Sequence, residues 1–178
     1  MIMVVLKRLS ALHATDYYNA MKHLPPISFD IKPHDGQFIN GRHYFACRVY
    51  FEDTDFSGVV YHANYLRYME RARSDMLRGL AMDQKASYDN GEGVYAVVDL
   101  SIKYIAPAKL DDDLLIITSL DELRGASVKM TQTIWKNKAQ IVSASVQAAF
   151  LTPEGRPRRQ PEAWTKAFRG AMTLATEN

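Results

Sequence analysis

Two polar side chains, Asp55 and His62, have types and a spacing that could support chemistry at one place. Asp55 closes the acidic segment 52–55, and His62 follows it across Gly58, which permits a tight turn. A carboxylate can act as a nucleophile or a general base, and a histidine can orient or protonate a reacting group. From the pattern alone, an Asx turn at Asp55 and a helix cap at His62 are the more common roles of such residues.

The elements that must position these two side chains can be predicted from the residues around them. Residues 42–51 are rich in β-branched and aromatic side chains, which predicts a strand that ends at the acidic segment. After His62, apolar residues recur at spacings of three and four, which predicts a helix over residues 63–79 with one broad apolar face. The backbone N–H groups at the start of that helix would favour a negative charge.

The remainder of the chain predicts a run of strands joined by short turns. Strands are expected at residues 94–105, 114–120, 127–135 and 139–151, with a loop at residues 83–93 and a short terminal helix at residues 162–169. Because short turns join antiparallel neighbours, we expect an α+β fold, with a curved antiparallel sheet of about five strands wrapped around the one long helix.

The first part of the chain has a different character. Residues 1–42 contain the tandem prolines Pro25 and Pro26 and show no strong strand pattern, so we expect an N-terminal extension outside the core, with the domain and a C-terminal tail at residues 43–178. Residues 1–12 are apolar but carry Lys7 and Arg8 in their middle. That order of charge differs from a secretory signal, and the stretch is too short to span a membrane.

Charge and cysteine content limit the partners and the compartment. The formal net charge is +2, from 22 basic and 20 acidic residues, which gives no electrostatic reason to expect nucleic acid as a partner. Residues 156–159 form a short basic run that is either solvated or contacts phosphate. Cys47 is the only cysteine, so no intramolecular disulfide can form, which fits a reducing cytoplasm.

Several kinds of catalytic site are absent from the sequence. There is no Gly-x-Ser-x-Gly elbow, phosphate-binding glycine loop or dinucleotide fingerprint. The histidines are scattered without the spacing of metal ligands, at His13, His23, His34, His43 and His62. We therefore expect no metal and no cofactor, which leaves Asp55 and His62 as the candidates for catalysis.

Several segments resemble one known family. Residues 52–55 (Glu-Asp-Thr-Asp), 58–65 (Gly-Val-Val-Tyr-His-Ala-Asn-Tyr) and 69–73 (Met-Glu-Arg-Ala-Arg) are similar to the 4-hydroxybenzoyl-CoA thioesterase family. Residues 104–112 and 123–127 are similar to later motifs of the acyl-CoA thioesterases encoded with the bacterial Tol–Pal envelope system. The resemblance covers roughly residues 43–160 and implies a hot-dog fold, in which the sheet wraps the long helix.

The resemblance also implies roles for individual residues. It places the family's catalytic carboxylate on Asp55 and the subfamily's histidine on His62, without deciding whether Asp55 is a nucleophile or a base. It assigns the polarisation of the thioester carbonyl to the backbone N–H groups near Tyr61 and His62. The subfamily often carries a tyrosine where this chain has Phe51, so the role of that hydroxyl is missing here or is taken by Tyr50 or Tyr61.

Two further residues have alternative roles. Some relatives of the fold use a glutamate on the helix as the nucleophile, which makes Glu70 the second candidate after Asp55. A structural pairing near Arg67 is the other role of Glu70. Arg124 lies in a predicted turn and is either solvated or contacts a phosphate of CoA.

The function that the resemblance implies is a cytoplasmic thioester hydrolase. Its substrate would be a short-chain or aromatic acyl-CoA, or an acyl carrier protein thioester, and it would form homodimers or homotetramers. One alternative is a non-catalytic hot-dog module that binds an acyl carrier or a partner in envelope assembly. Another is a hot-dog dehydratase, which pairs a histidine with a carboxylate across a dimer. Release of a free thiol would separate the hydrolase from the binding module.

Overall fold

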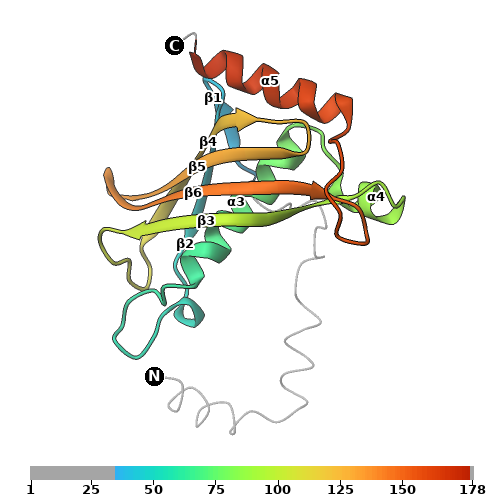
Figure 1. The fold of residues 1–178 in the computed structure, drawn as a ribbon. Coiled ribbons are helices and arrows are strands. Elements are labelled where there is room, and N and C mark those ends of the chain that lie inside the picture. The colour runs from blue at the N-terminus through green and yellow to red at the C-terminus, as the bar shows by residue number, and fades with distance from the viewer. Residues whose placement is uncertain (1–34, 177–178) are drawn as a thin grey trace, which may run out of the picture. The chain divides into compact units, whose positions relative to one another are not determined.

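A computed structural model describes residues 35–176, which form one antiparallel sheet with a long helix against one face (Figure 1). The helices are α3 (Asn64–Gly79), α4 (Gln84–Asp89) and α5 (Glu162–Thr176), and a 3-10 helix, η1, spans Phe51–Asp53. The strands are β1 (Gln37–Ile39), β2 (Arg42–Arg48), β3 (Val94–Tyr104), β4 (Asp113–Leu123), β5 (Ser127–Lys136) and β6 (Ala139–Leu151). Among these described residues, no helix is long and apolar enough to cross a membrane.

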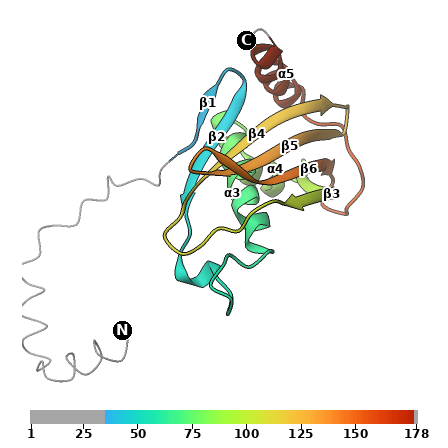
Figure 2. The same ribbon diagram turned by 90° about the vertical axis from the view of Figure 1, so that its left-hand side faces the viewer.

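The sheet has the strand order β1-β2-β4-β5-β6-β3, and every neighbouring pair is antiparallel. It curves around α3, which lies along its concave face (Figure 2). The expected α+β architecture, one curved antiparallel sheet around one long helix, is confirmed. β3 pairs with β6 rather than with its neighbour in the sequence, so it forms one edge of the sheet.

The sheet has six strands rather than about five, because β1 and β2 form a hairpin. Asn40 and Gly41 make its turn with φ angles of 49° and 71°, which is the backbone that an Asn-Gly pair favours between two strands. The domain boundary expected at residue 42 therefore falls inside a hairpin of the sheet. Residues 1–34 of the expected extension lie outside the described part of the chain.

The apolar face of α3 fills the centre of the fold. Its buried side chains follow the helical spacing, at Tyr65, Tyr68, Met69, Ala72 and Met76. They share one core cluster with inward-facing strand residues such as Ile116, Ile134 and Val146. The sequence pattern predicted this face, and burial of such a stripe is what holds a helix of ordinary propensity in place.

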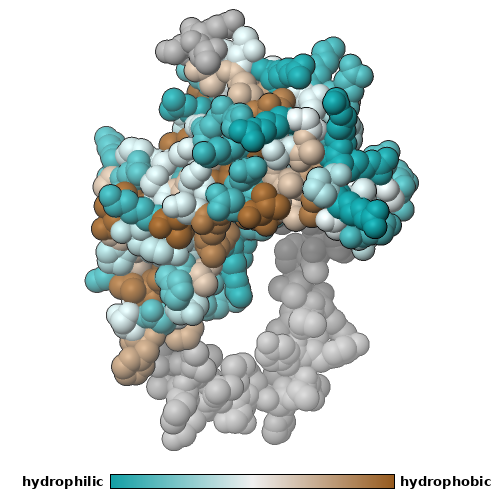
Figure 3. All heavy atoms as spheres, viewed as in Figure 1, coloured by the Kyte–Doolittle hydropathy of each residue, from teal (hydrophilic) through white to brown (hydrophobic). Residues whose placement is uncertain are grey.

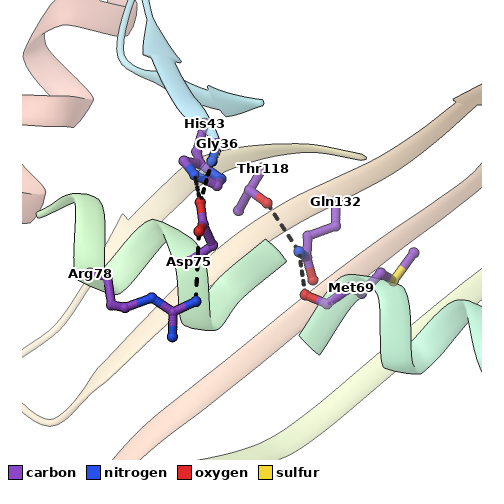
Figure 4. Close-up of polar contacts among 7 residues, drawn as sticks. All are labelled: Gly36, His43, Met69, Asp75, Arg78, Thr118 and Gln132. Atoms are coloured by element: carbon purple, nitrogen blue, oxygen red, sulfur yellow. Dashed lines mark hydrogen bonds and ion pairs between the residues drawn. The ribbon is translucent and has the colours of Figure 1, made fainter. Parts of the chain in front are cut away.

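Two buried polar groups attach α3 to the sheet (Figure 4). The Gln132 amide on β5 donates to the Met69 carbonyl on α3 and to the Thr118 hydroxyl on β4, at 3.1 and 3.0 Å. On the next turns of α3, the Asp75 carboxylate contacts His43 Nε2 at 2.9 Å and accepts the Gly36 N–H at 2.8 Å. The bonds to α3 join residues that are 32 to 63 positions apart in the sequence, so both groups fix how the helix sits on the sheet.

The His43 imidazole is buried, with 1% of its surface exposed. Burial lowers the pKa of His43, and the hydrogen bond to Asp75 opposes that shift only in part. Within the described residues its Nδ1 atom has no hydrogen-bond partner. A proton on Nδ1 would therefore be buried without an acceptor, and we assign the neutral ring whose Nε2–H donates to Asp75.

Several boundaries differ from the sequence predictions, and β4 runs to Leu123 rather than residue 120. Three of the other differences have a local reason. β2 ends at Arg48 rather than residue 51, because the Asp53 carboxylate accepts the Tyr50 N–H and starts a turn. Residues 84–89, expected in a loop, form α4, since the Asp83 side chain caps the Ala86 N–H. The terminal helix α5 runs to Thr176 rather than residue 169. Its buried Phe168 and Ala171 continue the helical spacing into the core.

Candidate active site

The acidic segment folds into a tight loop between η1 and α3. The Asp55 N–H donates to the Val59 carbonyl at 2.9 Å, and the Gly58 N–H donates to the Asp55 carbonyl at 3.0 Å. Gly58 has a φ of 77°, a conformation that other residues rarely adopt. Thr54 and Val60 form a β-bridge that closes the loop. The loop therefore holds Asp55 near its tip, beside the start of the long helix.

The Asp55 carboxylate is exposed, and one of its oxygens is already bonded. Oδ1 accepts the Ser57 N–H at 2.8 Å and the Ser57 hydroxyl at 2.5 Å. These two bonds, the hydroxyl first, lower the pKa of Asp55 below its ordinary range, with a smaller contribution from the charge of His62. The Asx turn that the pattern favoured is thus present. Both Ser57 bonds go to Oδ1, and the Val59 N–H also favours the ionised carboxylate, which stays exposed to a substrate.

We expect the Ser57→Ala substitution to move the acid limb of the pH–rate profile to higher pH. The Ser57 hydroxyl stabilises the ionised carboxylate, so its loss raises the pKa of Asp55 toward its ordinary value. A rate that needs ionised Asp55 is full above that pKa and falls as pH drops through it. The measurement is kcat/KM against pH for both proteins, with melting curves at each pH. Superimposable acid limbs would show that ionisation of Asp55 does not limit the rate.

Asp53, the second aspartate of the segment, has a structural place. It is buried, and its side-chain Oδ2 accepts the Tyr50 N–H at 2.8 Å. Its carbonyl accepts the Tyr61 N–H and the side-chain amide of Asn64, each at 2.9 Å. Asp53 and the buried Asn64 therefore join the end of β2, the base of the loop and the first turn of α3. This arrangement agrees with the structural role that the sequence favoured for Asp53.

His62 lies at the start of α3 with its side chain exposed. Its ring packs against Tyr61, with centroids 4.4 Å apart, and its carbonyl accepts the Tyr104 hydroxyl at 3.1 Å. The Tyr61 N–H, one of the expected donors to a substrate oxygen, already donates to Asp53. In the part of the chain that the structure describes, no acceptor contacts the N–H groups of His62 and Ala63. These two amides are the ones that a ligand could use.

A surface hollow of about 280 Å³ lies beside this helix start. Its walls include His62, Tyr65, Tyr104 and Pro107, so the loop after β3 forms one side of it. Tyr65 is buried, and its hydroxyl accepts the Ala108 N–H at 2.9 Å. Tyr104 and Tyr65 were not among the site residues that sequence reasoning singled out. The motif at residues 104–112 was the signal that could have pointed to Tyr104.

The other candidate residues lie apart from this loop in the same chain. Glu70 is about 12 Å along the helix axis beyond His62, and Arg73 and Ser74 hold its two oxygens at 2.5 and 2.9 Å. Arg124 pairs with Glu122 in the β4–β5 turn. Tyr104, beside His62, pairs with Val142 on β6, and the β4–β5 turn that carries Arg124 contacts Phe150 on the same strand. Eight residues of extended strand separate Val142 from Phe150, so Arg124 lies about 26 Å from the helix start.

The aromatic residues around the loop are strongly exposed. Phe51 and Tyr50 have 77% and 61% of their surface accessible, and Tyr61 has 47%. In the described part of the chain the hydroxyls of Tyr50 and Tyr61 have no partner. No group of three or more described His, Cys, Asp or Glu side chains is arranged to hold a metal ion. The groups that this loop and the helix start present are a carboxylate, a histidine and two backbone N–H groups.

Comparison with known proteins identifies the same class of chemistry. Residues 57–143 match the thioesterase superfamily. The chain is 41% identical over 128 residues to the acyl-CoA thioesterase YbgC of Haemophilus influenzae, a match that covers 72% of this chain and 92% of that protein.

Solved structures agree with this match. A probable thioesterase from Bartonella henselae is 40% identical, with a TM-score of 0.64 over 67% of this chain and 99% of that one. A 1,4-dihydroxy-2-naphthoyl-CoA thioesterase from Synechocystis, 22% identical, shares the fold with a TM-score of 0.67 over 72% of this chain and 96% of that one. The expected hot-dog fold is thus confirmed.

Proposed function

The chain belongs to the thioesterase superfamily and is a thioester hydrolase, and on that premise we propose that it hydrolyses short-chain or aromatic acyl-CoA to the free acid and CoA. The observation that supports this site most strongly is the Asp55 carboxylate. It is exposed, has a lowered pKa and precedes the start of α3 by one short loop, where the N–H groups of His62 and Ala63 have no acceptor among the described residues. The relatives named acyl-CoA thioesterase support CoA as the carrier.

In the proposed mechanism, the thioester carbonyl oxygen accepts the N–H groups of His62 and Ala63. Negative charge develops on that oxygen as the carbonyl carbon is attacked, and fixed donors at a helix N-terminus stabilise it. Asp55 either attacks the carbon itself or removes a proton from the attacking water. Both routes need the ionised carboxylate, and both break the bond to sulfur. Direct attack expels the CoA thiolate and leaves a mixed anhydride on Asp55, which water then hydrolyses to the free acid. In the other route the activated water adds to the carbonyl carbon and the thiolate leaves; in each route the thiolate takes up the proton that water loses. His62 orients the substrate or the water.

The experiment that tests this function is thiol release across a panel of acyl-CoAs by the full chain. Acetyl-, butyryl-, benzoyl- and 4-hydroxybenzoyl-CoA cover short and aromatic acyl groups, and an acyl carrier protein thioester tests the other carrier. Saturable release from at least one CoA ester supports the proposal. Binding of acyl-CoA or acyl carrier protein without thiol release would overturn it and would favour the non-catalytic module.

We also propose that the chain forms a homo-oligomer through the outer edge of β3. Within the described residues this edge pairs with no strand, and its apolar side chains Val97, Val98 and Leu100 are exposed. Hydrophobic residues gather along β3 on the face seen in Figure 3. An edge of this length with apolar side chains is normally covered by another chain, and two copies of one edge can pair about a twofold axis.

We expect a charge at this edge to dissociate the oligomer. Val98 lies between Val97 and Asp99, where the register of β3 with β6 shifts, and it has no partner residue on β6. Val98→Lys should therefore leave the β3–β6 pairing intact. The matched control is Ile39→Lys on β1, the opposite edge of the sheet. Light scattering at micromolar concentration should give a multiple of the chain mass for the wild type and the control, and the monomer mass for Val98→Lys. A monomeric wild type would refute the proposed assembly.

Three finer assignments belong to the same proposal. The motifs at residues 104–112 and 123–127 support membership of the Tol–Pal-associated branch. The single Cys47 fits a reducing cytoplasm. Because Arg124 lies far from Asp55 in its own chain, a contact from Arg124 to a CoA phosphate would come from a partner subunit.

A further inference from the structure

Tyr104, at the last position of β3, contacts the backbone of the helix start through its side chain. Its hydroxyl donates to the His62 carbonyl at 3.1 Å. Its ring meets the His62 imidazole edge-on, with centroids 6.4 Å apart and planes at 86°. One phenol therefore contacts both the peptide group and the side chain of His62.

The Tyr104 ring is itself supported from the core side. It packs against Tyr65 with centroids 5.7 Å apart. Tyr65 is 3% exposed, and its hydroxyl accepts the Ala108 N–H, while the Ala108 carbonyl accepts the Val60 N–H at 2.8 Å. The segment after β3 thus contacts the base of the Asp55 loop and the start of α3. These contacts hold the Tyr104 ring in position, although the residue is partly exposed.

We propose that Tyr104 is a positioning residue for thioester hydrolysis, an inference that rests on the proposed function. The His62 carbonyl and the Ala63 N–H belong to the same peptide group. A donor on that carbonyl fixes the plane of the group and polarises it, so its N–H becomes a stronger donor to a developing oxyanion. The ring contact holds the His62 imidazole on the same side of the helix start.

Other phenols near the loop do not have this geometry. Tyr50 and Tyr61 are exposed, and within the described residues their hydroxyls make no hydrogen bond. Phe51 has no hydroxyl. Tyr61→Phe is therefore a matched control for Tyr104→Phe. Each variant loses one hydroxyl beside His62, and only Tyr104 loses a bond to the peptide group.

The test compares the steady-state kinetics of the two variants. Loss of one hydrogen bond of ordinary strength that acts in the transition state should lower kcat of Tyr104→Phe by about three- to ten-fold. KM should change by less than about two-fold, since the hydroxyl is proposed to act through the His62 peptide group, to which it donates. Melting temperatures should stay close to wild type, because Tyr104 is 43% exposed. Equal kcat in Tyr104→Phe and Tyr61→Phe would overturn the inference, and so would an effect confined to KM.

A second readout does not depend on turnover. The amide resonance of Ala63 should shift in Tyr104→Phe and remain near its wild-type position in Tyr61→Phe. An unmoved Ala63 amide in Tyr104→Phe would refute the positioning role even if the wild type hydrolysed no acyl-CoA. If the wild type releases thiol and the two variants behave alike, the inference fails while the proposed function stands.

Discussion

Asp55→Asn should lower kcat for acyl-CoA hydrolysis by about 10²–10⁴-fold. The substitution keeps the shape of the side chain and one acceptor for the Ser57 N–H and hydroxyl, but it removes the negative charge. A neutral amide is neither a nucleophile for a thioester nor a base for water. Binding should persist, because the helix-start amides and the hollow beside them are unchanged. The measurement is steady-state thiol release with the best substrate of the panel.

The matched control for this substitution is Glu52→Gln, in the same acidic segment. Glu52 is exposed and makes no hydrogen bond among the described residues, so the variant has the same loss of charge without the proposed role. It should retain near wild-type kcat. Both variants should melt close to the wild type, since neither side chain is packed in the core. A comparable loss of kcat in both variants would point to the charge of the segment rather than to Asp55.

Asp75→Ala should have the largest effect on folding, lowering the free energy of unfolding by about 2–5 kcal/mol. The buried carboxylate accepts bonds from Gly36 and His43, and its loss leaves the buried His43 Nε2–H and the half-buried Gly36 N–H without acceptors. The same loss detaches the β1–β2 hairpin from α3 (Figure 4). Chemical denaturation at neutral pH gives the free energy directly, and kcat per folded molecule should stay within a few-fold of wild type.

Asp113→Ala is the comparison for that result. Asp113 pairs with Arg48 at 2.7 Å, but both side chains are more than half exposed, at 72% and 57%. Such an exposed pair is screened by water and contributes little to the free energy of unfolding, so Asp113→Ala should melt close to the wild type. Equal destabilisation by Asp75→Ala and Asp113→Ala would show that the His43–Asp75 group does not hold the helix to the sheet.

Local patterns in the sequence were sufficient for much of the fold. The apolar spacing of α3 and the strand patterns at residues 127–135 and 139–151 predicted α3, β5 and β6 to within one residue of their observed ends. The Asn40–Gly41 turn was an equally local signal, and its hairpin was not predicted. The polar, glycine-containing composition of residues 83–93 predicted a loop, but the Asp83 side chain caps the Ala86 N–H and residues 84–89 form the helix α4.

The site was predictable in part for the same reason. Asp55, Gly58 and His62 lie within one short loop, so their proximity follows from the chain itself. Tyr104 reaches His62 only because β3 pairs with β6 at the edge of the sheet. The Tyr61 N–H donates to the Asp53 carbonyl because the loop between them folds back on itself. Contacts of this kind depend on tertiary pairing and on side-chain packing, which a residue pattern does not specify.

Single-turnover hydrolysis of benzoyl-CoA, with enzyme in excess, tests the central role of Asp55 most directly. It measures the chemical step without product release. The wild type and Glu52→Gln should release one thiol per bound substrate at similar rates, and Asp55→Asn should bind the substrate but release thiol at least about 10²-fold more slowly. Release by Asp55→Asn at the wild-type rate would contradict the assignment and would make Glu70 the carboxylate to test next.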